Sequence, residues 1–382
     1  MTGTERSAFA VLTPPGRGGI AVIRCTGPDV ERALLASFQP TRGGAGLPPV
    51  GALAYGHVVD ADGRPLDEII LCRAAAVTCE VNCHGGPAAV AAVCEALAAL
   101  GLEQVDADAL LEIEGRGPIE RDARRLLRRA TTPLAARILL DQLGGALGAA
   151  VGRVGDALAA GRPDEADEVI GRLLDRWRQC GRFLADPPRI VIAGRPNVGK
   201  STLLNRLAGA DRALTSETPG TTRDYVEVDA ALAGLPVVLV DTAGLREAQA
   251  RVERLGVERA REQAAGAALL LYLLDATEGV TAEDEPALAR FDERTLVVWN
   301  KADAATRPLG AAGALAISAL TGDGVADLAE AALARLGYRG AERGEAVPLT
   351  GEQAETLARG RQLAAGGRIG AARQALAALL MP

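Results

Sequence analysis

Aromatic side chains are scarce in this sequence, since phenylalanine, tryptophan and tyrosine together make up 3% of its 382 residues. A chain of this length folds into roughly two or three domains with sizeable cores. Those cores must therefore be built mainly from alanine, leucine and valine. No apolar run approaches the ~18 consecutive residues that indicate a membrane span, and the N-terminus carries no apolar signal run. The sequence predicts a globular, cytoplasmic protein without a membrane partner.

An excess of positive charge is missing too. The formal net charge is −7, so no broad basic field indicates nucleic-acid binding, although this does not exclude a local basic patch. The six cysteines are scattered, and we expect them to be reduced in the cytosol. In "CEVNCH", Cys79, Cys83 and His84 lie close together, but no second ligand cluster follows. Strand alternation would place both cysteines on one face, which favours core thiols over a metal site.

The chain divides into four stretches. Residues 1–117 mix short apolar runs such as "IAVIR" and "EIILC" with Gly/Pro turns, which predicts an α+β domain, and "AAVAAVCEALAALG" reads as a helix closed by Gly101. Residues 118–187 carry apolar residues at helical spacing. Over residues 188–338, apolar strands alternate with helical stretches, which predicts an α/β domain with a mostly parallel sheet. Residues 339–382 begin with a polar segment and become helical again.

The stretch "GRPNVGKSTLLN" fits the phosphate-loop pattern G-x-x-x-x-G-K-[ST] and lies between an apolar strand and an apolar helix. Its glycines let backbone N–H groups approach the β-phosphate at a helix N-terminus. Lys200 should reach the β- and γ-phosphates, and the Ser201 hydroxyl should bind Mg²⁺. The residues expected to contact nucleotide here are Asn197, Val198, Gly199, Lys200, Ser201 and Thr202.

Two further stretches belong at the phosphates. "VVLVDTAG" is a buried strand ending in Asp241, which suits a Walker-B aspartate near Mg²⁺, and the Gly244 N–H can contact the γ-phosphate. In "TPGTTRD" a threonine, expected to be Thr222, would complete the Mg²⁺ shell and sense the γ-phosphate. The nucleotide contacts expected in these stretches are Ser216, Glu217, Thr218, Pro219, Gly220, Thr221, Thr222, Asp241, Thr242, Ala243 and Gly244.

The stretch "NKAD" identifies the base. The Asp303 carboxylate can accept hydrogen bonds from guanine N1–H and the 2-amino group, whereas adenine presents the wrong pattern there. The Lys301 stem can lie over the base, and a backbone N–H of "SAL" could meet guanine O6. The order of the motifs therefore predicts GTP rather than ATP. The expected base contacts are Asn300, Lys301, Ala302, Asp303, Ser318, Ala319 and Leu320.

One position is informative because it lacks a glutamine. Ras-like enzymes orient the attacking water with a Gln directly after the "DTAG" stretch, but here that residue is Leu245, which cannot position water. Hydrolysis must use another group, and the acidic candidates nearby are Glu247 and Glu253.

Together with "TPPGRGGIAVIRCTG" and "CHGGPAAV" in the first hundred residues and "DTAGLREAQARVERLGVERA" in the GTPase part, these motifs resemble the bacterial MnmE (TrmE) family of tRNA modification GTPases. The resemblance implies a P-loop, Ras-like G domain of the α/β class inserted into a helical domain. It implies an N-terminal α+β domain that binds a tetrahydrofolate derivative and forms a homodimer. A flavin-dependent partner protein would share in modifying the wobble uridine of tRNA.

The resemblance also implies roles for particular residues. A potassium ion would supply the charge that an arginine finger gives elsewhere, and dimerisation of the G domains would activate hydrolysis. Glu253 would position the water, with Lys200 and Asn197 as the other catalytic groups. Arg24 and Glu80 match the folate site, where Arg24 could pair with a glutamyl carboxylate. The implied K⁺ ligands are the Asn197 side chain and the backbone carbonyls of Ser216, Thr218 and Thr221.

The sequence departs from the family pattern in three places. It reads "CRAAAVTCEVNCHGG" where a "SYTGED"-like segment is expected, and "IEGRGPIERDARRLLRRATTPLAARI" where an "RAFLNGKxDLxQAEA" element is expected. It reads "ALAALLMP" without a C-[IV]-G-K motif. Three functions stay open: a tRNA-modifying GTPase, a GTP-dependent switch without modification chemistry, and a ribosome-assembly GTPase. The N-terminal motifs argue against the third.

Overall fold

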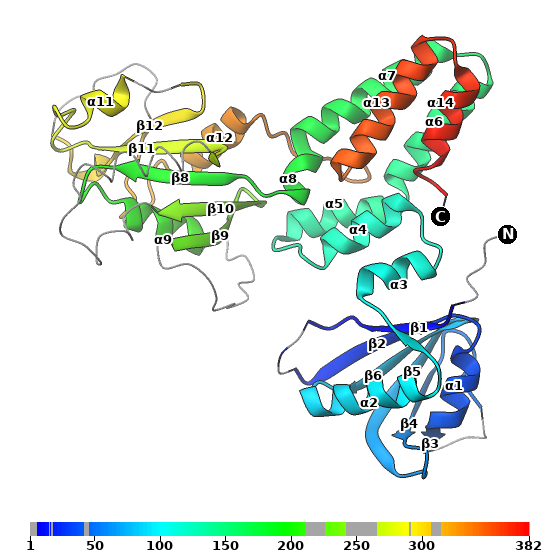
Figure 1. Cartoon of the computed structure of the whole chain (residues 1–382). Coiled ribbons are helices and arrows are strands. Elements are labelled where there is room, and N and C mark those ends of the chain that lie inside the picture. Colours follow the sequence, from blue (N-terminus) through cyan, green and yellow to red (C-terminus); the bar gives the residue numbers. More distant parts are fainter. Residues whose placement is uncertain are drawn as a thin grey trace. The chain divides into compact units, whose positions relative to one another are not determined.

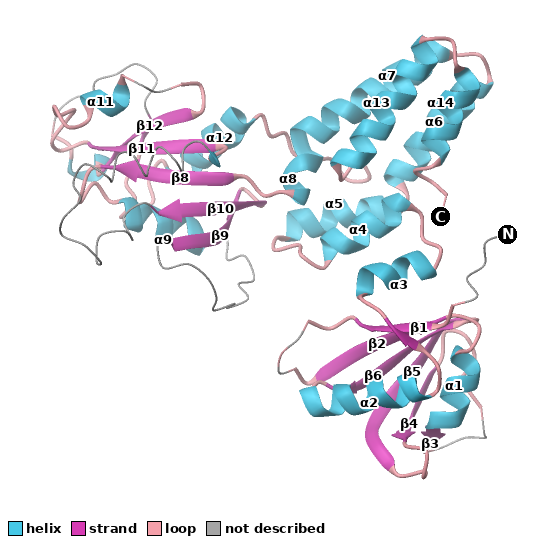
Figure 2. Cartoon of the chain, in the orientation of Figure 1, coloured by secondary structure: helices cyan, strands magenta, loops and turns pink. Residues whose placement is uncertain are grey.

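The computed structural model describes residues 6–14, 16, 18–41, 46–210, 226–241, 266–289, 292–306 and 315–381 (Figures 1 and 2). The described chain forms two compact units, and the division falls between Arg121 and Asp122. Within these residues no single helix is long and apolar enough to cross a membrane; one pair of consecutive helices, bent by 41°, meets the length and composition test only when taken together.

The first unit is built on a seven-stranded sheet in the order β3-β4-β5-β6-β2-β1-β7. All neighbours are antiparallel except β1 and β7, which are parallel. Its elements are β1 (Ala8–Val11), β2 (Ile20–Thr26), α1 (Val30–Ser37), β3 (Phe38–Pro40), β4 (Leu53–Val59), β5 (Pro65–Ala75), β6 (Thr78–His84), α2 (Pro87–Ala99), β7 (Glu103–Gln104) and α3 (Ala107–Ile113). This mixture of one sheet with a few helices confirms the α+β class expected here.

Helices α1 and α2 cover one face of this sheet (Figure 1). The core between them is aliphatic, with a single phenylalanine, Phe9, among its fully buried large side chains. On the other face, α3 packs Leu110 and Ile113 against β1. Helix α2 begins with Pro87 at its first turn and stops just before Gly101, as the sequence predicts.

The second unit joins helices to a second sheet. Its helices before that sheet are α4 (Pro118–Leu127), which begins in the first unit, α5 (Pro133–Leu143), α6 (Ala146–Ala159), α7 (Pro163–Arg176), the π-helix η1 (Trp177–Gly181) and α8 (Arg182–Ala185). Those after it are α13 (Gly351–Ala365) and α14 (Ile369–Ala377). Helix α7 packs against α13, and α6 packs against α14. The helices that precede the sheet in sequence and those that follow it therefore form one bundle (Figure 2).

Gln142 of α5 ties the two helical segments together. Its amide is buried, and Nε2 donates to the carbonyls of Ile138 and Glu345, both at 3.0 Å. Its Oε1 accepts the Val347 N–H at 3.1 Å. The backbone that leads into α13 therefore has its polar groups satisfied by a side chain roughly two hundred residues earlier, as buried polar groups require.

The second sheet has six strands in the order β13-β12-β11-β8-β10-β9, all parallel except the antiparallel edge strand β9. Its elements are β8 (Arg189–Gly194), α9 (Lys200–Ala210), β9 (Val226–Leu232), β10 (Leu235–Asp241), β11 (Leu269–Asp275), α11 (Glu285–Leu288), β12 (Thr295–Asn300), the 3₁₀ turn η3 (Ala302–Ala304), β13 (Leu315–Ala316) and α12 (Val325–Leu336). The mostly parallel sheet predicted for this part of the chain is confirmed. Because the strands are parallel, the carboxyl ends of β8, β10, β11 and β12 lie at one edge, where ligands bind in such sheets.

Candidate functional site

The loop between β8 and α9 is shaped by two glycines in the left-handed region. Gly194 has φ 142° and Gly199 has φ 93°, and a non-glycine, Asn197, adopts φ 62° between them. A Cβ at Gly194 would lie 2.5 Å from the Leu273 carbonyl oxygen, and one at Gly199 would clash with the Asn300 side-chain amide. These turns leave the loop tightly curled in front of α9, the geometry in which successive backbone N–H groups bind a phosphate.

Lys200 is the first residue of α9, and its side chain turns back over the loop. Its ammonium group donates to the carbonyls of Gly194 and Arg195, at 3.0 and 2.7 Å, and the residue is only 8% exposed. The next two residues, Ser201 and Thr202, are exposed in the first turn of the helix. The loop therefore presents one fixed cation and a helix N-terminus at the same place, which suits phosphate groups.

Asn300, at the end of β12, connects the phosphate loop to the base-recognition side. Its buried amide donates to the Val198 carbonyl at 2.7 Å, and its Oδ1 accepts the Ala319 N–H at 2.9 Å. The sequence predicts Asn300 as a nucleotide contact. The structure places its side chain between two protein loops, so it brings residues 198 and 319 to one site.

The remaining base-side residues surround the end of β12. Lys301 has φ 63° and its Nζ lies 2.5 Å from Oδ2 of Asp275. Ala302 donates its N–H to the Ile317 carbonyl, and Asp303 is exposed on η3. An exposed carboxylate on a short turn beside a fixed lysine is accessible to a planar base.

The loop 318–320 is hydrogen-bonded to a side chain of α9. Ser318 and Ala319 are buried, whereas Leu320 is exposed. The Arg206 guanidinium of α9 donates to the carbonyls of Ala319, at 3.1 Å, and Leu320. The structure therefore brings the predicted residues of 197–202, 300–303 and 318–320 together at one edge of the sheet.

For the predicted nucleotide contacts in the other two stretches, the structure describes only the backbone of Asp241. The backbone of Asp241 ends β10, where it pairs with Ile192 of β8. The rest of that set lies outside the described residues: Ser216, Glu217, Thr218, Pro219, Gly220, Thr221, Thr222, Thr242, Ala243 and Gly244. Leu245 and the acidic candidates for hydrolysis, Glu247 and Glu253, also lie outside them.

Two buried aspartates near this site were not predicted from the sequence. Asp275 ends β11 and accepts hydrogen bonds from Lys301 and from the N–H and hydroxyl of Thr277; although burial raises its pKa, these bonds outweigh burial and hold the pKa below the usual value. Asp284 pairs with Arg195 of the phosphate loop. The sequence did contain a signal for Asp275, because it ends an apolar strand in the same way as Asp241, which was predicted as a site residue. Asp284 had none, since it is one of several acids in "TAEDEPAL".

The folate candidates lie in the first unit, on neighbouring strands. Arg24 of β2 pairs with Glu80 of β6 at 2.7 Å, and its Nε lies 2.5 Å from the buried carboxylate of Glu114. Burial lowers the pKa of the Arg24 guanidinium, but the two carboxylates outweigh burial and raise it. The Arg24 side chain therefore contacts two carboxylates of its own chain.

The cysteines behave as core thiols, as the sequence predicts. Cys79 and Cys83 are buried on the same face of β6, and burial raises the pKa of each thiol to about 11. His84 points elsewhere and contacts Asp67 at 2.6 Å. Among the residues that the structure describes, no group of three or more His, Cys, Asp or Glu side chains could hold a metal ion.

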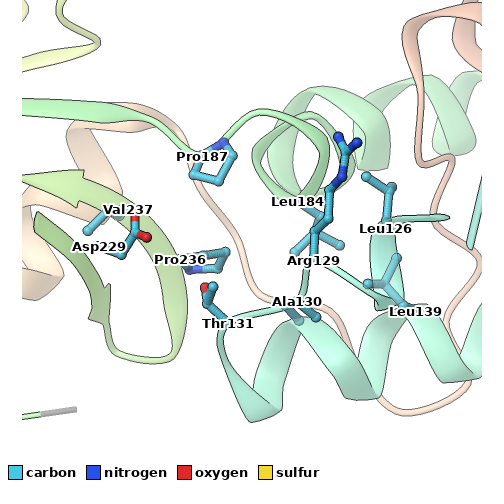
Figure 3. A pocket seen from close by; sticks show the side chains of 11 residues that line it. Leu126, Arg129, Ala130, Thr131, Leu139, Leu184, Pro187, Asp229, Pro236 and Val237 are labelled. Carbon is cyan, nitrogen blue, oxygen red and sulfur yellow. The ribbon is translucent and has the colours of Figure 1, made fainter. Parts of the chain in front are cut away.

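A cavity of about 190 Å³ lies elsewhere in the second unit, between helices α4, α5 and α8 and the β9–β10 hairpin (Figure 3). Leu126, Leu139 and Leu184 line its helical side, with Arg129, while Asp229 lies on the strand side. None of the residues predicted to bind nucleotide or folate lines it, so the nucleotide motifs define the candidate site and the cavity does not.

Comparisons with known proteins found family matches in both units. Residues 7–107 match the family described as "GTP-binding protein TrmE N-terminus" and residues 189–301 match "50S ribosome-binding GTPase". A tRNA modification GTPase MnmE of Chloroflexus aurantiacus is 38% identical over 77% of this chain and 72% of that protein. Those of Parasynechococcus marenigrum and a Synechococcus species are 35% and 34% identical, over 88% and 94% of this chain and 82% and 89% of those proteins. The chain therefore belongs to the MnmE family of tRNA modification GTPases.

Proposed function

We propose that this protein binds and hydrolyses GTP and uses the cycle in modifying the wobble uridine of tRNA. The observation that carries the proposal is the joint presence, on one chain, of a TrmE-type N-terminal part and of a phosphate loop that is hydrogen-bonded to Asn300, the first residue of "NKAD". The N-terminal match disfavours the alternative of a ribosome-assembly GTPase. A switch without modification chemistry is the remaining alternative.

In this proposal the described residues divide the nucleotide between them. Lys200 and the loop 194–199 take the β- and γ-phosphates, and Asp303 recognises guanine. Ser201 supplies an oxygen ligand for Mg²⁺, which fits an exposed hydroxyl next to Lys200. Thr222 and Asp241 complete the proposed metal shell. When bound, Mg²⁺ neutralises charge on the β- and γ-phosphate oxygens.

We further propose that the GTPase reaction depends on potassium. Asn197 is exposed in the phosphate loop with φ 62°, and Leu245 leaves no glutamine for the water. The ligands would be the Asn197 amide oxygen and the carbonyls of Ser216, Thr218 and Thr221, with Glu253 positioning the water. A fixed cation beside the phosphates stabilises charge that develops in the transition state.

The expected result is faster GTP turnover in KCl than in NaCl at equal ionic strength, by at least about tenfold. Asn197→Ala should remove this difference while GTP still binds, because Lys200 and the loop N–H groups remain. Asn205→Ala, an exposed asparagine of α9 beyond the first turn, is the control and should keep the potassium response. Equal rates of the parent protein in both salts would rule out the proposal.

The domain arrangement proposed with this function has boundaries at 1–117, 118–187, 188–338 and 339–382. The first domain would bind a tetrahydrofolate derivative near Arg24 and Glu80, the Ras-like G domain would be inserted between the two helical segments, and the protein would act in the cytoplasm with the flavin-dependent partner.

We also propose that the first unit forms a homodimer through its sheet. Ile20, Leu53, Tyr55 and Ile70 are exposed and, by strand register, share the face opposite α1 and α2. Exposed apolar side chains on one face of a sheet can mark a protein interface. Light scattering should give a dimer without nucleotide, and Tyr55→Glu should give a monomer. A parent protein that is monomeric at micromolar concentration would contradict this.

The decisive experiment for the overall function is mass spectrometry of wobble uridine in tRNA from a strain that lacks this gene. Reintroducing the chain should restore the modified uridine, and the Lys200→Ala variant should not. Restoration by neither, combined with intact GTP turnover in vitro, would favour the switch without modification chemistry.

A further inference from the structure

The segment 275–284, between β11 and α11, has a buried aspartate at each end. Asp275 is 2% exposed and Asp284 is fully buried. A buried carboxylate is unfavourable unless it is paired and hydrogen-bonded. The partners of these two carboxylates therefore indicate what the segment holds in place.

Asp284 accepts hydrogen bonds from three residues. Arg195 Nε lies 3.1 and 2.9 Å from its two oxygens, and the Tyr272 hydroxyl lies 3.1 Å from Oδ1. The Thr281 N–H and hydroxyl donate to Oδ2 at 3.0 and 2.9 Å. The carboxylate is thus fixed by its own segment and by β11, and its remaining contact reaches into the phosphate loop.

Arg195 carries that contact to the nucleotide side. Its Nη1 also pairs with Glu278 of the same segment at 2.9 Å. Although burial lowers the pKa of the guanidinium, these acids outweigh it and raise the pKa. The Arg195 carbonyl accepts the Lys200 ammonium at 2.7 Å. The side chain of Arg195 is therefore held by the segment, and its backbone holds Lys200.

The other end of the segment contacts Lys301, one of the residues predicted to bind the base. The Asp275 carboxylate accepts Lys301 Nζ at 2.5 Å, while the Thr277 hydroxyl fixes its second oxygen at 2.6 Å. Lys301 sits in the left-handed region, which is unfavourable for a residue with a Cβ. The pair with Asp275 fixes the direction of its side chain in that strained conformation.

The sequence adds an independent observation. Of its 42 lysine and arginine residues only two are lysines, Lys200 and Lys301, and the segment 275–284 contacts one directly and the other through Arg195. A lysine is a compact point charge that arginine does not replace at a tight site. Resting on the proposed GTP binding, we propose that the segment 275–284 positions both lysines, with Asp284 acting on Lys200 through Arg195 and Asp275 acting on Lys301.

Double-mutant cycles test this, because residues that act through one another are not additive. The measured quantity is the dissociation constant of Mg·GDP, taken from the shift in melting temperature over a GDP titration that reaches weak binding. Asp284→Asn should weaken GDP about tenfold in the parent protein and in Lys301→Met, but less than about twofold in Lys200→Met. Asp275→Asn should show the reverse pattern, with its effect lost in Lys301→Met.

The matched control is Asp292→Asn, which removes an exposed carboxylate paired with Arg294 at 3.1 Å in the same part of the chain. It should leave GDP affinity unchanged. Asp284→Glu keeps the charge and should recover part of the affinity. If Asp284→Asn does not fold, Tyr272→Phe, which removes one donor to Asp284, takes its place in the cycle with Lys200→Met and should show the same loss of effect.

Equal losses for Asp284→Asn in the Lys200→Met and Lys301→Met backgrounds would overturn the proposal, since a general loss of structure affects both alike. That outcome differs from failure of the proposed function, in which the parent protein itself would not bind GDP.

Discussion

Replacing Gly199 with alanine is expected to weaken GDP and GTP binding by about two orders of magnitude or more. The backbone there has φ 93°, and the left-handed region costs about 1–2 kcal/mol for a residue with a Cβ. The new methyl group would also clash with the side-chain amide of Asn300, and overpacking of this kind costs about 1–3 kcal/mol. A summed strain of about 3 kcal/mol corresponds to roughly a hundredfold in affinity if the loop relaxes when empty.

The strain acts on function because of what Asn300 holds. Its amide bonds both the Val198 carbonyl and the Ala319 N–H, so moving it disturbs the phosphate loop and the loop 318–320 together. Gly209→Ala is the control: it lies in α9, the helix that follows the loop, and a Cβ there meets nothing within 4 Å. Calorimetric titration with Mg·GDP should give parental affinity for Gly209→Ala. Parental affinity for Gly199→Ala would show that the loop tolerates the methyl group and that the described geometry is wrong.

The sequence predicted well those positions whose function depends on residues close to them in the chain. The phosphate loop needs two glycines, one lysine and one hydroxyl at fixed spacing, and the turn into α9 follows from that spacing alone. The strands β8, β10, β11 and β12 were predictable for a similar reason, because each is a buried, continuous apolar run.

Edge elements were harder to predict. Strand β9 was not predicted, since it is the antiparallel edge strand and its apolar residues are interrupted by Glu227 and Asp229. It is joined to β10 by Ala233 and Gly234, both with positive φ, which is the geometry of a tight hairpin. The long helical stretch after residue 118 is broken into α4, α5 and α6 at Pro133 and at the glycine pair 144–145. Proline and glycine gave a local signal there that helical periodicity alone does not carry.

The sequence could not predict contacts between residues that are far apart in the chain. Arg195 and Asp284 are 89 positions apart, and Arg24 and Glu114 are 90 apart. Charged residues are frequent in this chain, so nothing local marks which acid pairs with which arginine. Only the folded sheet brings them together, and burial then makes the pairing obligatory. The sequence predicted Asn300 as a nucleotide contact but not as the link between Val198 and Ala319, because these two partners come from separate loops.

Asp303→Asn is expected to reverse the base preference of this protein, from guanine to xanthine nucleotides. Asp303 is exposed on the turn after β12, beside Lys301, where its carboxylate offers two acceptors to guanine N1–H and the 2-amino group. An asparagine there offers one acceptor and one donor. Xanthine carries a carbonyl in place of the 2-amino group, so the donor of asparagine meets an acceptor instead of another donor.

The size of the change follows from the bonds involved. A hydrogen bond to a charged group is worth about 1.5–3 kcal/mol, so losing one of the two carboxylate acceptors should weaken GTP binding by about tenfold to a hundredfold. Xanthosine triphosphate should gain a similar factor, because the parent carboxylate opposes its carbonyl. Asp327→Asn removes an exposed carboxylate from α12 in the same part of the chain and should change neither affinity. Competition of GTP, XTP and ATP against a fluorescent nucleotide measures all three, and a parent protein that binds ATP as tightly as GTP would refute base recognition by Asp303.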